Sequence, residues 1–167
     1  MIELLILYVL AKNTFTMYGI SKEIKKEFSV LTIPSLGTIK PALQRLEKRS
    51  CIKTQKTMSS GGRPSTFYSI TNEGRLELKE LILAEPLENP IQFLPTSRIK
   101  VVCSEHLETK ERVELFKLLK IKCEKIILDI SKKENQEFYY KMILENLVCE
   151  YKNFVSLLEA LSRAGNN

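Results

Sequence analysis

Two alternating stretches on either side of a glycine pair restrict the folds open to this chain. The stretch "CIKTQKT" alternates from Ile52 to Thr57, and "STFYSI" repeats the alternation after the glycines. Such alternation of β-branched and aromatic residues is typical of strands. Gly61 and Gly62 can adopt the positive φ of a tight turn, so the segment predicts a β-hairpin with a glycine-hinged loop.

Helical patterns surround this hairpin. Three precede it, over residues 1–13, 17–28 and 35–50, and one follows, over residues 71–85. Each places apolar residues at helical spacing on one face. The order helix, helix, helix, strand, loop, strand, helix predicts a helix-turn-helix with a β-wing over residues 1–84.

The third helix has Ser35 as its expected N-cap. Its apolar residues form one stripe, and basic and hydrogen-bonding residues lie mostly on the opposite side of the helix. Pro41 lies past the first turn and removes a backbone hydrogen bond, so we expect a kink there or a helix start nearer Gly37. The stripe consists of Leu36, Ile39, Leu43 and Leu46.

Prolines separate this pattern from the second half. Residues 85–97 hold three prolines and show no helical period, which predicts a linker. Residues 98–167 show only helical patterns, so the fold class is mainly α with a small β-wing. The last helix repeats apolar residues in steps of four and three over three heptads, which predicts a coiled-coil seam. This seam consists of Tyr140, Leu144, Leu147, Tyr151, Phe154, Leu158 and Leu161.

The positive charge lies in the first half. Residues 1–84 carry 13 lysines and arginines against 7 acidic residues, whereas residues 85–167 carry 13 against 13, and the net charge of the chain is +6. A basic domain joined to a neutral one indicates that the first half binds a polyanion.

Several other classes of protein are disfavoured. No apolar run approaches the roughly 18 residues of a membrane span. A lone His106 and the absence of nucleophile-elbow, zinc-protease or P-loop motifs give no support to an enzyme, a metal site or a cofactor. Widely spaced cysteines predict buried free thiols in a reducing cytoplasm. They are Cys51, Cys103, Cys123 and Cys149.

Candidate DNA contacts lie on the third helix and on the hairpin. Gln44 can pair with adenine and Arg45 with guanine in the major groove. Ser35 lies near a helix N-terminus, which suits a phosphate, and Arg63 offers a planar donor fork at the wing. The full set is Ser35, Thr38, Lys40, Gln44, Arg45, Lys48, Lys53, Lys56, Arg63 and Tyr68.

Residues 4–82 resemble the PadR-like family of transcriptional regulators. The resemblance runs through "LILYVLAKNTFTMYGISKEI", "IPSLGTIKPALQRLEKRSCI" and "GGRPSTFYSITNEGRLEL". The last two are similar to the family patterns G-T-x-Y-x-x-L-x-R-L-E and G-R-x-x-x-Y-x-I/L-T-x-x-G. Lys40 replaces the usual tyrosine, and Ser50 stands where a glycine is expected to end the recognition helix.

The resemblance implies a cytoplasmic bacterial repressor or activator, and of these we predict a repressor. It implies a homodimer that binds a pseudo-palindromic operator in double-stranded DNA with two winged helices. The C-terminal helices dimerise in this family, which makes the seam from Tyr140 to Leu161 the expected dimer interface. The resemblance also places Tyr68 in the second wing strand.

Two alternatives stay open at this point. Some members of the family accept a small planar or phenolic effector near the dimer interface, and aromatic residues of the last helix could line such a site. Winged helices also serve as protein–protein interaction modules, in which a basic face binds an acidic partner. The aromatic candidates are Tyr139, Tyr140, Tyr151 and Phe154.

Overall fold

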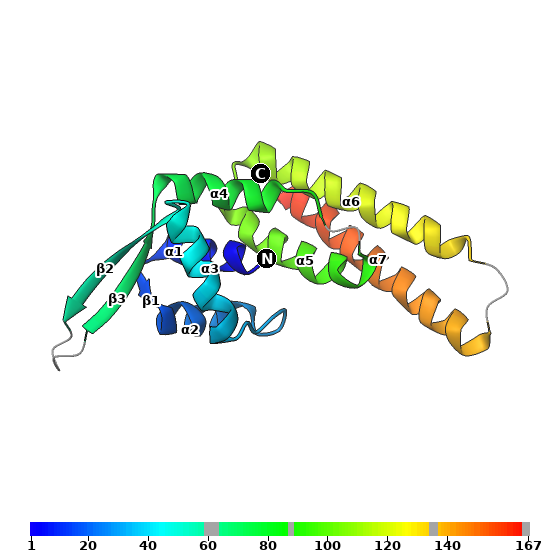
Figure 1. Cartoon of the computed structure of the whole chain (residues 1–167). Helices are drawn as coiled ribbons and strands as arrows, with labels where there is room; N and C mark the ends of the chain where they lie inside the picture. Colours follow the sequence, from blue (N-terminus) through cyan, green and yellow to red (C-terminus); the bar gives the residue numbers. More distant parts are fainter. Residues whose placement is uncertain (59–63, 87–88, 134–136, 165–167) are drawn as a thin grey trace. The chain divides into compact units, whose positions relative to one another are not determined.

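The computed structural model describes residues 1–58, 64–86, 89–133 and 137–164 of the 167-residue chain. It divides into two compact units, residues 1–84 and 85–167 (Figure 1). Each unit has its own set of packed elements. Within the described residues, no helix combines the length and the apolar character that crossing a bilayer requires.

The first unit is a winged helix. Its helices and strands follow the predicted order, with one additional short strand after the first helix. The elements are α1 (Ile2–Lys12), β1 (Phe15–Thr16), α2 (Met17–Phe28), α3 (Leu36–Lys48), β2 (Ile52–Met58), β3 (Pro64–Ile70) and α4 (Asn72–Leu83).

Helix α1 forms the centre of this unit. Every residue from Leu4 to Leu10 is buried, and the helix contacts α2, α3, α4 and β3. A helix that is apolar on all sides is stable only inside a core. The Tyr8 ring meets the ring of Phe28 edge to face at 5.2 Å between centroids, which links α1 to α2.

The sheet has three antiparallel strands in the order β1-β3-β2. Strands β2 and β3 pair from Ile52 with Ile70 at the base to Met58 with Pro64 at the tip. Strand β1 is only two residues long, too short for an alternating pattern in the sequence. Thr16 ends it and also caps α2, because its side chain accepts a hydrogen bond from the Gly19 amide at 3.1 Å.

The turn between α3 and β2 depends on Ser50. This residue, which stands where the resemblance predicted a glycine, adopts the left-handed conformation with φ 59°. Its carbonyl accepts a hydrogen bond from Thr71 Oγ1 at 2.6 Å. The backbone of Cys51, the next residue, packs closely against Gly74 of α4. A Cβ at Gly74 would lie 1.9 Å from the carbonyl oxygen of Cys51.

The second unit is entirely helical in its described part. It consists of α5 (Pro90–Cys103), a short 3₁₀ helix η1 (Ser104–His106), α6 (Thr109–Ser131) and α7 (Phe138–Ala164). The predicted linker over residues 85–97 is wrong from residue 90 onward. Pro90 occupies the first helical position, where its missing N–H is tolerated, and Asn89 caps the helix. Burial of Phe93 and Leu94 offsets the hydrogen bond lost at Pro95.

The predicted coiled-coil seam of α7 packs against α6 of the same chain. Leu144, Tyr151, Phe154 and Leu158 are buried, and α7 contacts α6, whose Leu115, Phe116, Leu119 and Cys123 are buried. Leu147 and Leu161 are half-buried, and Tyr140 is exposed. The seam therefore gives most of these residues a partner in their own chain, contrary to their predicted role in contacting a second copy.

The cysteines are free thiols. The prediction that they are buried holds for Cys51, Cys103 and Cys123 and is wrong for Cys149, which is exposed on α7. Cys149 lies outside the buried seam of that helix. Burial raises the pKa of the Cys123 thiol to about 12.

Replacing Ser50 with glycine should stabilise the first unit. Glycine adopts positive φ without the steric cost that a side chain carries, so we expect Ser50→Gly to raise the free energy of unfolding by about 0.5–1 kcal/mol. Ser29→Gly is the matched control, because Ser29 also ends a helix but at φ −58°. Urea denaturation followed by circular dichroism measures both. A Ser50→Gly protein that is no more stable than the parent would contradict the strain assigned to this turn.

Candidate nucleic-acid interface

The outer side of α3 is exposed along its length. Ile39, Ala42, Leu43 and Leu46 are buried and hold the helix against α1 and α2. Leu36, predicted to join this apolar stripe, is 44% exposed because it occupies the first helical position. The six predicted contact residues of this region are all exposed: Ser35, Thr38, Lys40, Gln44, Arg45 and Lys48.

Helical spacing orders these residues around α3. Opposite the buried stripe, the outermost ridge consists of Gly37, Pro41, Gln44 and Lys48. Gly37 and Pro41 present little side-chain bulk, so the backbone of the first two turns can approach a surface closely. Pro41 was expected only to kink the helix, although helical spacing also places it on this exposed ridge.

The N-terminus of α3 presents polar groups to solvent. Ser35 is the N-cap, as predicted, but its side chain makes no capping hydrogen bond. Its Oγ instead lies 3.0 Å from Oγ1 of Thr38. Two hydroxyls therefore stand beside the first backbone N–H groups of the helix, an arrangement suited to an anion.

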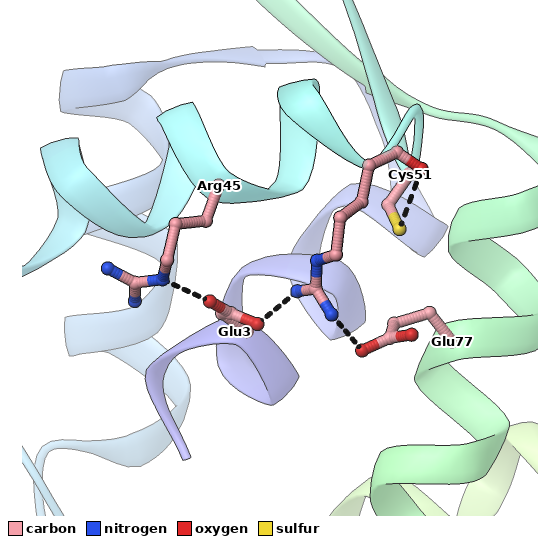
Figure 2. A network of polar contacts seen from close by, with 5 residues as sticks. Glu3, Arg45, Cys51 and Glu77 are labelled. Carbon is pink, nitrogen blue, oxygen red and sulfur yellow. Dashed lines mark hydrogen bonds and ion pairs between the residues drawn. The ribbon is translucent and has the colours of Figure 1, made fainter.

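Arg45 belongs to a polar network at the other end of α3 (Figure 2). Its Nε donates to Glu3 Oε1 at 2.7 Å, and the second oxygen of Glu3 accepts from Arg49. Arg49 also donates to Glu77 of α4 at 2.8 Å. Burial alone would lower the pKa of Arg49, but the two carboxylates outweigh burial and raise that pKa. Arg45 thus has its Nε committed within the unit.

The remaining lysines of this surface have no such commitment. Among the described residues, no ion pair involves Lys40, Lys48, Lys53 or Lys56. Their charges are therefore available to an external anion. On α2, Lys22 is also exposed, one turn after the exposed Tyr18.

The two lysines of the wing lie on opposite faces of the sheet. Lys53 pairs with Ser69 and Lys56 with Thr66, and alternation along β2 turns their side chains to opposite sides of the sheet. Tyr68 shares the face of Lys56 and is half-buried. Burial, with a smaller effect from Glu47, raises the pKa of its phenol. Arg63, the predicted contact at the loop, lies outside the described residues.

The second unit contains a cavity of about 550 Å³ between its own helices. Its walls are mainly apolar, and Lys122, Lys125, Lys133 and Asp129 stand among them. Lys122 is paired with Glu85 at 3.6 Å. Tyr140 and Tyr151 line the cavity, and Tyr151 donates its hydroxyl to the carbonyl of Pro90 at 3.1 Å. Tyr139 and Phe154, the other aromatic candidates, are not among the lining residues.

The chain is similar to known transcriptional regulators in sequence and in fold. Residues 6–80 match the model of the transcriptional regulator PadR-like family. A PadR-like transcriptional regulator from Bacillus cereus is 31% identical, with 47% of this chain and 74% of that chain covered and a TM-score of 0.41. Bacillus subtilis PadR in complex with operator DNA is 20% identical over 98% of both chains, with a TM-score of 0.46.

The same Bacillus subtilis protein in complex with p-coumaric acid is also similar. It is 20% identical, with 99% of this chain and 95% of that chain covered and a TM-score of 0.43. A comparison with curated proteins found no significant match.

Removing the shared carboxylate should weaken the network around α3. Glu3→Gln deprives two guanidinium groups of their common acceptor, so we expect a loss of about 1 kcal/mol in the free energy of unfolding, reduced in high salt. Glu23→Gln is the control, because the described ion pair of Glu23 is with the exposed Lys26 of its own helix. Urea denaturation at low and high NaCl measures both variants. Equal effects from the two would mean that Glu3 has no special bridging role.

Proposed function

Because the chain belongs to the PadR-like family of transcriptional regulators, we propose that it is a repressor that binds a pseudo-palindromic DNA operator as a homodimer. The observation that carries this proposal is the exposed side of α3, which is free of acidic side chains from Ser35 to Gln44 and ends in Lys48, a lysine outside every ion pair among the described residues. The cytoplasm is the compartment that such a role requires.

The dimensions of α3 suit the major groove of B-form DNA. A helix of 13 residues is about 20 Å long, and a recognition helix lies in the groove with its exposed side toward the base edges. The outer ridge then faces the base edges. We assign Gln44 to a base edge, where its amide can both donate and accept.

Other residues suit phosphate contacts better than base reading. Ser35 and Thr38 offer hydroxyls beside free backbone N–H groups, and Lys40 and Lys48 supply point charges. Arg45 keeps its Nε on Glu3, so we assign its terminal nitrogens to a phosphate. Lys53, Lys56, Arg63 and Tyr68 form the wing part of the interface, which reaches the backbone beside the groove.

We also propose an effector site in the cavity of the second unit. Apolar walls with tyrosines suit a planar aromatic ring, and the excess of lysines over acids suits a carboxylate attached to it. The p-coumaric acid bound by Bacillus subtilis PadR is a ligand of this chemical class. Binding there would shift the positions of α6 and α7 and so regulate DNA binding.

Two substitutions separate base reading from phosphate binding. An operator is first selected from a random pool of duplexes, and affinity is then measured by fluorescence anisotropy over a NaCl series. We expect Gln44→Ala to cost about 1–3 kcal/mol on the operator and little on unrelated DNA. Lys56→Ala should weaken both equally and lower the salt slope by about one per subunit.

Lys117→Ala on α6 is the control for this experiment, since Lys117 is exposed in the second unit. If both Gln44→Ala and Lys56→Ala bound like the parent, the assigned interface would be wrong. Absence of any duplex binding, together with a stable complex with an acidic protein, would favour a protein–protein module instead.

Ligand binding in the cavity can be measured without DNA. At a concentration of p-coumarate ten times its Kd, we expect Tm to rise by about 3 °C. The double variant Lys125→Glu/Lys133→Glu should abolish the shift, because it replaces attraction for a carboxylate by repulsion. Lys110→Glu, near the start of α6, is the matched control. An identical shift in the double variant would place the ligand elsewhere.

A further inference from the structure

The exposed ridge of α3 contains the two types of residue that favour a helix least. Gly37 and Pro41 stand four residues apart on this ridge, and both are exposed. Glycine and proline have the lowest helix propensities of all residues. Packing of the core does not account for them, because the buried residues of α3 lie on the opposite side of the helix.

The surroundings of Gly37 do not require a glycine. In the described part of the chain, a Cβ at Gly37 would meet Ser35 Oγ at 3.7 Å, an ordinary van der Waals distance, and no closer atom. Its backbone is helical and does not use positive φ. Gly74 is the opposite case, because a Cβ there would lie 1.9 Å from the carbonyl oxygen of Cys51. The fold therefore explains Gly74 and leaves Gly37 unexplained.

Pro41 changes the hydrogen bonding of Gly37. In an α-helix the amide of residue 41 donates to the carbonyl of residue 37, and proline has no N–H to donate. The Gly37 carbonyl therefore lacks its helical donor. Because residue 37 has no side chain, its own residue does not cover this carbonyl either.

The dimensions of the major groove give such a ridge a use. The groove is about 12 Å wide, and an α-helix with its side chains is about 10–12 Å across. A helix of that diameter fills the groove, so the bulk of the residues on its ridge decides how deeply it lies. With glycine at position 37 and the compact ring of Pro41 after it, the backbone of α3 can reach the base edges.

We propose that the Gly37 carbonyl accepts a hydrogen bond from the exocyclic amino group of an adenine or a cytosine in the major groove. These amino groups are the hydrogen-bond donors that base pairs present there. The inference rests on the proposed binding of α3 to DNA and adds a main-chain contact to it. Gly37 and Gln44 lie about 10 Å apart along the helix axis, which corresponds to about three base pairs. The two contacts therefore read separate base pairs of one half-site.

Two substitutions should stabilise the protein and weaken operator binding. Gly37→Ala fills an open position with a better helix former, so we expect Tm to rise by about 2–4 °C. Pro41→Ala supplies the missing amide and closes the helical hydrogen bond, so we expect Tm to rise by about 5–10 °C.

The same two variants should each raise the dissociation constant for the selected operator about tenfold. In Gly37→Ala the new Cβ holds the backbone away from the bases, and in Pro41→Ala the new amide competes for the carbonyl. Affinity for unrelated DNA should change little, because the phosphate contacts remain. Lys117→Ala, the exposed α6 control, should leave operator affinity unchanged. Gly74→Ala should lower Tm, because its Cβ would clash with the backbone of Cys51.

Modified duplexes identify the base. Each adenine of the operator is replaced in turn by purine and each cytosine by 2-pyrimidinone, so that one exocyclic amino group is lost at a time. At one position of each half-site, the parent protein should lose about tenfold in affinity and Pro41→Ala should lose nothing. A position read by Gln44 would weaken both proteins alike.

The outcomes separate this main-chain contact from the proposed function. A parent protein that binds no duplex would overturn the function itself. If the parent binds its operator and either variant binds equally well, the carbonyl contact is overturned and the function stands. The same holds if both variants lower Tm, since the fold would then explain both residues, or if no modified base distinguishes the parent from Pro41→Ala.

Discussion

Burial of α1 on every side is the constraint on which the first unit depends. A helix with no solvent face must be surrounded, and α2, α3, α4 and β3 each turn one side toward it. The apolar stripe of α3 is used in this way, which leaves its other side exposed. The surface that we assign to DNA is therefore the side of α3 that the core does not need.

Electrostatics then divides the basic residues of this surface into two groups. Glu3 and Glu77 hold Arg45 and Arg49 and join α1, α3 and α4 at one end of α3. In the part of the chain that the structure describes, no ion pair holds the lysines of α3 and β2. Charges that are already neutralised contribute little to binding a polyanion, so the unpaired lysines dominate the proposed interface.

The second unit depends on the packing of α7 against α6. The buried seam of α7 stabilises each chain through α6, and Lys120 pairs with Glu159 across the two helices. The cavity lined by Tyr140 and Tyr151 lies between the same two helices, so a ligand bound there would contact both α6 and α7.

Sequence by itself determined the winged-helix order, the apolar stripe of α3 and the charge difference between the halves, because periodicity and composition are local properties. It also predicted the exposure of the six α3 contacts. Only the tertiary structure decided that α5 is a helix despite its prolines, that Arg45 is held by Glu3 and that the seam of α7 closes inside the chain. Heptad spacing predicts that a helix packs against another helix, but it does not identify that helix. A charged residue in the sequence likewise does not identify the distant residue that pairs with it.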